Sequence, residues 1–129
     1  MIKILKGLCF LFISGIAIAD GDHVPGYVAI GPENSYMMGT FSARFDTTPT
    51  VYPTYIGAGG YAGGVLYFYG QDADGRQFYC YIPTSSSIYS ASVDIKNTLS
   101  LGSLISVSRK PPTSECSAVY SAKASHYLN

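Results

Sequence analysis

The stretch LYFYGQDADGRQFYCYIP, residues 66–83, predicts a β-hairpin around which the rest of the fold is organised. Two runs of alternating aromatic and aliphatic residues, 65–70 and 76–82, flank a short polar segment that contains a glycine. Alternation of this kind is typical of strands with one buried face, and a glycine-containing gap between two such runs is typical of a hairpin turn.

Parity within the two runs predicts the register of the hairpin. The tyrosines stay on one face only if Tyr69 opposes Tyr79 and Tyr67 opposes Tyr81, because a slip of one residue would mix the faces. This register requires a three-residue loop, 73–75. Loops of that length place a left-handed residue last, where Gly75 stands.

Asp72 and Asp74 in this loop raise the alternative of a calcium site. An EF-hand needs oxygen ligands at alternate positions and a glutamate at the twelfth. Here the third ligand position is Arg76 and the twelfth is Pro83. The pattern therefore favours turn hydrogen bonds for both acids, and no metal or cofactor is predicted.

Alternation predicts strands elsewhere in the chain as well. They cover residues 26–30, 36–45, 54–58, 103–109 and 116–128. In the second of these, the residues expected on the buried face are Met37, Gly39, Phe41, Ala43 and Phe45. In the fourth, they are Ile105 and Val107. In the last, they are Cys116, Ala118, Tyr120, Ala122, Ala124 and Leu128. The glycine-rich GGYAGG after residue 58 predicts a hairpin turn, because the Lys-Ser/Thr of a phosphate-binding loop is missing.

A single segment of the mature chain changes to helical spacing. Ile88, Ala91, Ile95 and Leu99 recur on one face of 85–99, with serines ahead as a cap. Gly102 is the expected stop.

The first residues have the features of a secretory signal peptide. Lys3 and Lys6 precede an apolar run over 8–18, and Ala17-x-Ala19 is a small-residue cleavage site, so we expect residues 1–19 to be removed. The apolar run is too short for a stable membrane span. Residues 20–129 then form a single secreted or periplasmic domain.

Two cysteines remain in that domain, Cys80 and Cys116. An even number in an oxidising compartment predicts one disulfide, between the strand before the helix and the last strand. The fold class expected is mainly β, a β-rich α+β domain. It would be a small antiparallel barrel or curled sheet, OB-like, with one packed helix.

Composition argues against nucleic acid as a partner. Without Lys3 and Lys6, six basic residues face eight acidic ones, and no basic cluster exists beyond Arg109-Lys110. Tyrosine is unusually frequent, with twelve residues against no tryptophan, and its apolar ring and polar tip favour half-exposed aromatic surfaces.

No catalytic motif stands out. Only His23 and His126 are available as histidines, their spacing fits no metal site, and no serine lies in a nucleophile elbow. The protein is therefore predicted not to be an enzyme. A small hydrolase that uses His126 is the alternative from that class.

The tyrosines of the hairpin are the candidate ligand-binding residues. They are Tyr67, Tyr69, Tyr79 and Tyr81, with Tyr61 at the adjacent glycine-rich turn. Such a cluster favours a platform for sugar rings or for a partner protein. The alternative is that a neighbouring element or a second copy of the chain covers it.

FYGQDADGRQFYCYIP, then SSSIYSASVDIKNTLSLGSLISVSR, then a late cysteine, resembles a set of small uncharacterised secreted proteins of Gram-negative bacteria, over residues 26–128. The order of strands, helix and two strands is also similar to the OB-fold B subunits of pentameric toxins. That second resemblance implies host glycans as ligands and a homo-oligomer as a compatible state.

We therefore expect a secreted, non-enzymatic binding protein that recognises a glycan or a cell-surface partner through its tyrosine-rich strands and glycine-rich loops. Two alternatives remain. One is a periplasmic or secreted protein inhibitor of an enzyme, acting through the GGYAGG or KPPTSE loop. The other is a component similar to a toxin B subunit.

Overall fold

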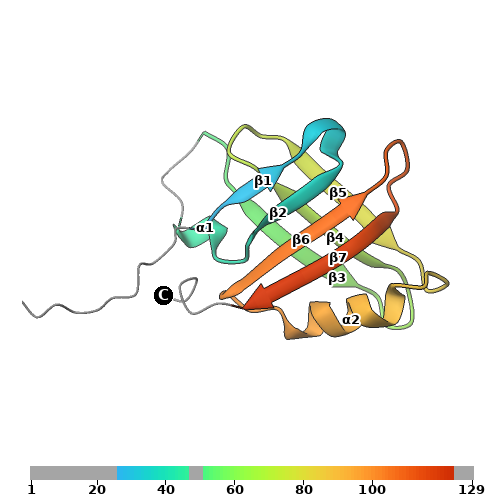
Figure 1. The fold of residues 1–129 in the computed structure, drawn as a ribbon. Coiled ribbons are helices and arrows are strands. Elements are labelled where there is room, and N and C mark those ends of the chain that lie inside the picture. The colour runs from blue at the N-terminus through green and yellow to red at the C-terminus, as the bar shows by residue number, and fades with distance from the viewer. Residues whose placement is uncertain (1–25, 47–50, 124–129) are drawn as a thin grey trace, which may run out of the picture.

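The computed structural model describes residues 26–46 and 51–123, which fold into two antiparallel sheets (Figure 1). One sheet has the order β1-β2-β6-β7, made of β1 (Val28–Ile30), β2 (Tyr36–Thr40), β6 (Ser103–Arg109) and β7 (Cys116–Lys123). The other has the order β3-β4-β5, made of β3 (Tyr55–Gly60), β4 (Leu66–Gln71) and β5 (Gln77–Ile82). The predicted signal peptide, both histidines and the expected strand residues 124–128 lie outside the described residues.

The two sheets lie one behind the other, with the hydrophobic core between them (Figure 1). The helix α2 (Tyr89–Thr98) runs along one side and packs against this core through Val93 and its flanking residues Ile88 and Leu99. Both sheets contribute to the core: its buried members are Ile30, Met37, Leu66, Phe68, Phe78, Cys80, Ile82, Ile105, Val107 and Cys116. The expectation of a mainly β, curled antiparallel fold with one packed helix is confirmed, and the sheets do not close into a barrel.

The predicted hairpin register is confirmed. Tyr69 pairs with Tyr79 and Tyr67 with Tyr81. The backbone N–H of Gly75 donates to the carbonyl of Asp72 at 3.0 Å, and Gly75 has a φ of 83°, the left-handed conformation expected there.

Asp72 organises this loop. Its Oδ1 accepts hydrogen bonds from the backbone N–H groups of Asp74 and Arg76 at 3.0 and 2.9 Å, and its Oδ2 accepts one from Nε of Arg76 at 2.8 Å. The Asp72 side chain is only 5% exposed, whereas that of Asp74 is 83% exposed. The carboxylate of Asp72 therefore stabilises the turn.

Replacing Asp72 with alanine should lower the free energy of unfolding by about 2 kcal/mol, because it leaves buried N–H donors without an acceptor and removes hydrogen bonds to a charged group. Urea denaturation of the wild type and of Asp72→Ala measures the difference. Asp74→Ala is the matched control and should change stability by less than about 0.5 kcal/mol. Equal stability of the two variants would contradict the role assigned to Asp72.

The prediction of one long strand over 36–45 is wrong beyond residue 40. Thr40 and Ser42 are fully buried and bond to each other, with 3.3 Å between their hydroxyl oxygens. Such local polar bonds compete with the strand ladder, and the chain turns into a short helix, α1 (Ala43–Asp46). As a result Phe45, expected in the core, is 70% exposed.

The inward face predicted for the last strand is also wrong after its first residue. Arg109 pairs with Cys116, but Ser108 pairs with Ala118, so one extra residue bulges at Ser117. A bulge of one residue reverses the parity of the later strand positions. Tyr120 consequently points outward and is 60% exposed. The inward positions Ile105 and Val107 of β6, by contrast, are confirmed.

The helix is confirmed in place but is shorter than expected. It begins after Ile88 without a side-chain cap and ends before Leu99, whose ψ of 139° is extended, so Gly102 is not its stop. Two residues of the predicted face, Ile88 and Leu99, pack against the core, but Ala91 is exposed and the buried residue of the helix is Ser92.

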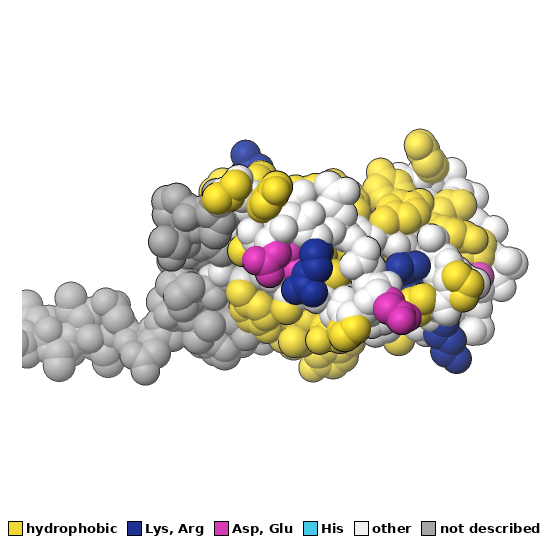
Figure 2. Space-filling view, turned by 90° about the horizontal axis from the view of Figure 1, so that it is seen from above, with side chains coloured by type: hydrophobic (Ala, Val, Ile, Leu, Met, Phe, Trp, Pro, Cys, Tyr) yellow, Lys and Arg dark blue, Asp and Glu magenta, His cyan; other side chains and the backbone are white. Residues whose placement is uncertain are grey.

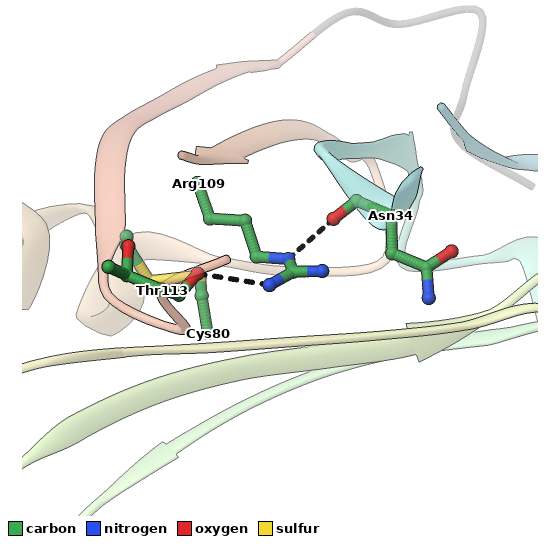
Figure 3. Close-up of a disulfide and its surroundings, with 5 residues drawn as sticks. Asn34, Cys80, Arg109 and Thr113 are labelled. Carbon is green, nitrogen blue, oxygen red and sulfur yellow. Dashed lines mark hydrogen bonds between the residues drawn. A yellow bond between two sulfur atoms is a disulfide. The ribbon is translucent and has the colours of Figure 1, made fainter. Parts of the chain in front are cut away.

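The predicted disulfide is confirmed. Cys80 of β5 and Cys116 of β7 are bonded, with 5.1 Å between their Cα atoms, and so connect the neighbouring edges of the two sheets. Beside it, Arg109 donates to the carbonyls of Asn34 and Thr113 at 2.6 and 3.0 Å (Figure 3). It also donates to the carbonyl of Glu33 at 3.0 Å. This guanidinium fastens the turn before β2 to the loop before β7.

Candidate functional site

The outer face of the three-stranded sheet carries the candidate site. Strand pairing arranges nine outward positions in three rows. The rows are Tyr55, Gln71 and Gln77; Gly57, Tyr69 and Tyr79; Gly59, Tyr67 and Tyr81. We call these nine residues the tyrosine face.

Alternation along the strands fixes which side chains reach this face. Phe68, Phe78 and Cys80 point into the core and are at most 2% exposed. Their neighbours in sequence therefore point outward. Tyr69 is 41% exposed and Tyr79 is 50% exposed, so the core holds the strands firmly while the rings remain accessible.

Two glycines of β3 determine how the rings lie. Gly57 is paired with Tyr69, and Gly59 is paired with Tyr67. A methyl group added to Gly57 would overlap the Tyr69 ring, and one added to Gly59 would overlap the tip of the Tyr67 ring. Both rings therefore lie across the backbone of β3, in space that only glycine leaves open. Aromatic cover of glycines in an edge strand is a known way to stabilise such a pair.

The rings contact one another as well. The centroids of Tyr67 and Tyr69 are 6.1 Å apart with a tilt of 32° between the planes. Tyr55 meets Tyr69 edge to face at 6.2 Å. Contacts of this geometry are favourable beyond the area they bury, so the three rings form one continuous aromatic surface.

A shallow hollow lies beside that surface. It has a volume of about 470 Å³ and is lined by Tyr61, Val65, Tyr67, Tyr79 and Tyr81. Because the β4 rings lie toward β3, the space above β4 and β5 stays open. We call this the tyrosine hollow.

The polar groups of the face are uncharged. Gln77 donates to Oε1 of Gln71 at 3.1 Å, and Gln71 donates to the carbonyl of Pro53 at 2.9 Å. The hydroxyls of the five tyrosines on the face make no hydrogen bond within 26–46 and 51–123. The face therefore offers flat apolar rings together with polar groups that are free to bond a ligand.

Four of the predicted site residues, Tyr67, Tyr69, Tyr79 and Tyr81, are brought together on this face, and Tyr61 lies at its edge in the turn. Tyr61 is 77% exposed. Sequence reasoning missed Tyr55, Gly57 and Gly59. The signal was present in TYIGAGG, where these three residues alternate with Ile56 and Ala58, but Gly59 was assigned to a turn, and Gly57, although placed in a strand, was given no role.

Groups typical of catalysis or metal binding are sparse in the part of the chain that the structure describes. No three His, Cys, Asp or Glu side chains gather there in a way that could hold a metal ion. On the face shown in Figure 2, acidic and basic side chains lie next to one another in places, and hydrophobic side chains (tyrosine included) are exposed around them. None of the helices within the described ranges has the length and apolar character needed to cross a membrane.

No family model, curated protein or solved structure matches this chain.

Proposed function

We propose that this chain is a secreted, non-enzymatic binding protein that recognises neutral glycans through the tyrosine face. The observation that carries the proposal is the combination of flat rings, an adjoining hollow and nine positions without a single charged side chain. The disulfide between Cys80 and Cys116 supports the secreted location, because such bonds persist in oxidising compartments.

Sugar rings suit this surface for a physical reason. A pyranose presents a face of C–H groups, which carry slight positive charge, and the face of an aromatic ring is negative. The hydroxyls at the rim of a sugar require hydrogen-bond partners. The tyrosine hydroxyls of the face, which have no hydrogen bond among the residues that the structure describes, and the carboxamide of Gln77 supply both donors and acceptors. The lack of charge on the face favours neutral sugars, because no cation stands there to balance a carboxylate.

Replacing Tyr79 with alanine is expected to weaken glycan binding by about tenfold, since loss of a central aromatic residue typically costs more than 1 kcal/mol of binding free energy. A glycan array with the purified protein identifies the ligand, and calorimetry with that ligand measures the loss. Tyr120→Ala is the matched control. Tyr120 is a comparably exposed tyrosine on β7 of the other sheet, and its removal should leave affinity unchanged.

Two outcomes would contradict the proposal. One is an array without binding at high protein concentration. The other is a Tyr79→Ala variant that binds as tightly as the wild type while Tyr120→Ala loses affinity.

A protein inhibitor is the second candidate function, and one observation favours it. The exposed loop 110–115 is held by Arg109, which donates to the carbonyl of Thr113 at 3.0 Å (Figure 3). It is also held by the N–H of Tyr81, which donates to the carbonyl of Ser114 at 2.9 Å. A loop held in one conformation loses little entropy on binding. If the protein binds an enzyme and Tyr79→Ala does not weaken that binding, the result would favour this loop over the tyrosine face as the binding site.

A further inference from the structure

The tyrosine hollow has a neighbour at each end. On the side of Gln77 lies a hollow of about 220 Å³, lined by Tyr55, Tyr69, Gln77 and Tyr79 together with the chain at 70 and 78. On the opposite side, between the turn 60–66 and α2, lies a hollow of about 230 Å³. We call them the glutamine hollow and the turn hollow.

The three hollows adjoin one another through shared residues. Tyr79 lines both the glutamine hollow and the tyrosine hollow. Tyr61 and Val65 line both the tyrosine hollow and the turn hollow. The rows of the face succeed one another along β4 and β5, and the turn comes after the last row, so the shared residues give the order glutamine hollow, tyrosine hollow, turn hollow.

The span of this series exceeds a single sugar ring. Gln77 and Tyr81 are four residues apart on one strand, which corresponds to roughly 13 Å, and the turn hollow extends beyond Tyr81. A monosaccharide in the tyrosine hollow would leave both neighbouring hollows empty.

The turn hollow is held in place by the rest of the fold. Tyr89 of α2 donates its hydroxyl hydrogen to the carbonyl of Gly64 at 2.6 Å and so fixes the turn beside the helix. Figure 1 shows α2 passing next to the turn that joins β3 and β4. Lys96 stands at the far wall of this hollow. Its ammonium group has Oδ1 of Asn97 as a distant partner at 3.5 Å, and it is therefore available to donate to a sugar hydroxyl.

We infer that the ligand is a linear neutral oligosaccharide of at least three sugar residues, which lies along the strands from Gln77 to Lys96 and places Tyr79 between its first two residues. This inference rests on the proposed glycan-binding function. The recognised unit is then an internal stretch of a glycan, and not a single terminal sugar.

Calorimetry with β-1,4-linked oligomers of glucose, xylose, mannose and N-acetylglucosamine, each from one to five residues long, tests the inference. For the type of oligomer that binds, affinity should rise by about tenfold or more between one and three sugar residues and then level off. Each of the three hollows adds contacts when a sugar occupies it, and a fourth sugar finds no further hollow. A monosaccharide that binds as tightly as the trisaccharide would overturn the inference and leave the proposed function standing. If no length of any glycan binds, both fail.

Variants at Lys96 locate the third subsite. In Lys96→Phe the phenylalanine ring should fill the turn hollow. Affinity should then level off at two sugar residues, while binding of the disaccharide stays unchanged. Lys123→Phe is the matched control: Lys123 is an exposed lysine at the end of β7 that lines none of the three hollows, and the levelling at three sugar residues should persist. An unchanged length dependence in Lys96→Phe, with an unfolding midpoint equal to that of the wild type, would overturn the path assigned to the ligand.

Discussion

Replacing Cys80 and Cys116 together with alanine is expected to lower the free energy of unfolding by about 4 kcal/mol. The bond closes a loop with a sequence separation of 36 residues. A cross-link over a loop of that length lowers the entropy of the unfolded chain by an amount worth roughly 3–4 kcal/mol at 25 °C. Both cysteines also belong to the buried core, so the loss of their sulfur atoms adds a packing term.

Because this bond joins the two sheets, its removal weakens the contact between the sheets more than it weakens either sheet by itself. It joins β5 and β7, the neighbouring edges of the two sheets. Besides the bond, the chain at this junction is linked by the N–H of Tyr81, which donates to the carbonyl of Ser114 at 2.9 Å. Urea denaturation in oxidising buffer measures the change. The wild type treated with a reductant serves as control: it keeps both sulfur atoms, so it should show the loss of the cross-link alone and be slightly more stable than the double variant. A difference below about 1 kcal/mol would contradict the prediction.

Replacing Gly57 and Gly59 together with alanine should weaken glycan binding by about thirtyfold or more without unfolding the protein. Each new methyl group would occupy space that a tyrosine ring now fills. The rings of Tyr67 and Tyr69 must then swing off β3, and the tyrosine hollow above β4 and β5 closes. The loss of two ordered rings corresponds to about 2 kcal/mol or more of binding free energy.

Stability should change by less than about 1 kcal/mol in this double variant. The rings are at the surface and can rotate, and alanine in a strand is more favourable than glycine by roughly 0.5–1 kcal/mol. A double-mutant cycle provides the control. In a Tyr69→Ala background, Gly57→Ala should cause no further loss of affinity, because no ring remains to be displaced. An additive loss in that background would show that Gly57 acts in some other way.

The hairpin of β4 and β5 could be predicted from the sequence, because the alternation of side chains along the two strands is enough to decide their register. The hairpin of β4 and β5 has a strict alternation of Phe68, Phe78 and Cys80 against the tyrosines, so only one register keeps the faces apart. The disulfide could be inferred from the presence of two cysteines in a secreted chain. The four hairpin tyrosines could be placed on one face by the same parity.

The remainder depended on contacts between segments distant in sequence. The bulge at Ser117 is set by the pairing of β6 with β7, and it reverses the faces of the rest of β7. The end of β2 at Thr40 depends on hydroxyl contacts inside the core. The roles of Gly57 and Gly59 appear only when β3 is paired with β4, since a glycine-rich run by itself is equally typical of a turn.

The cover of β3 by rings from β4 has a consequence for how these positions can change over time. Gly57 and Tyr69 act as one unit, as do Gly59 and Tyr67. A side chain at either glycine displaces the ring of the paired tyrosine from β3, so the ring keeps its present position only while the glycine is kept. Among descendants of this chain we therefore expect the members of each pair to vary together, with a bulky residue on one strand or the other and seldom on both.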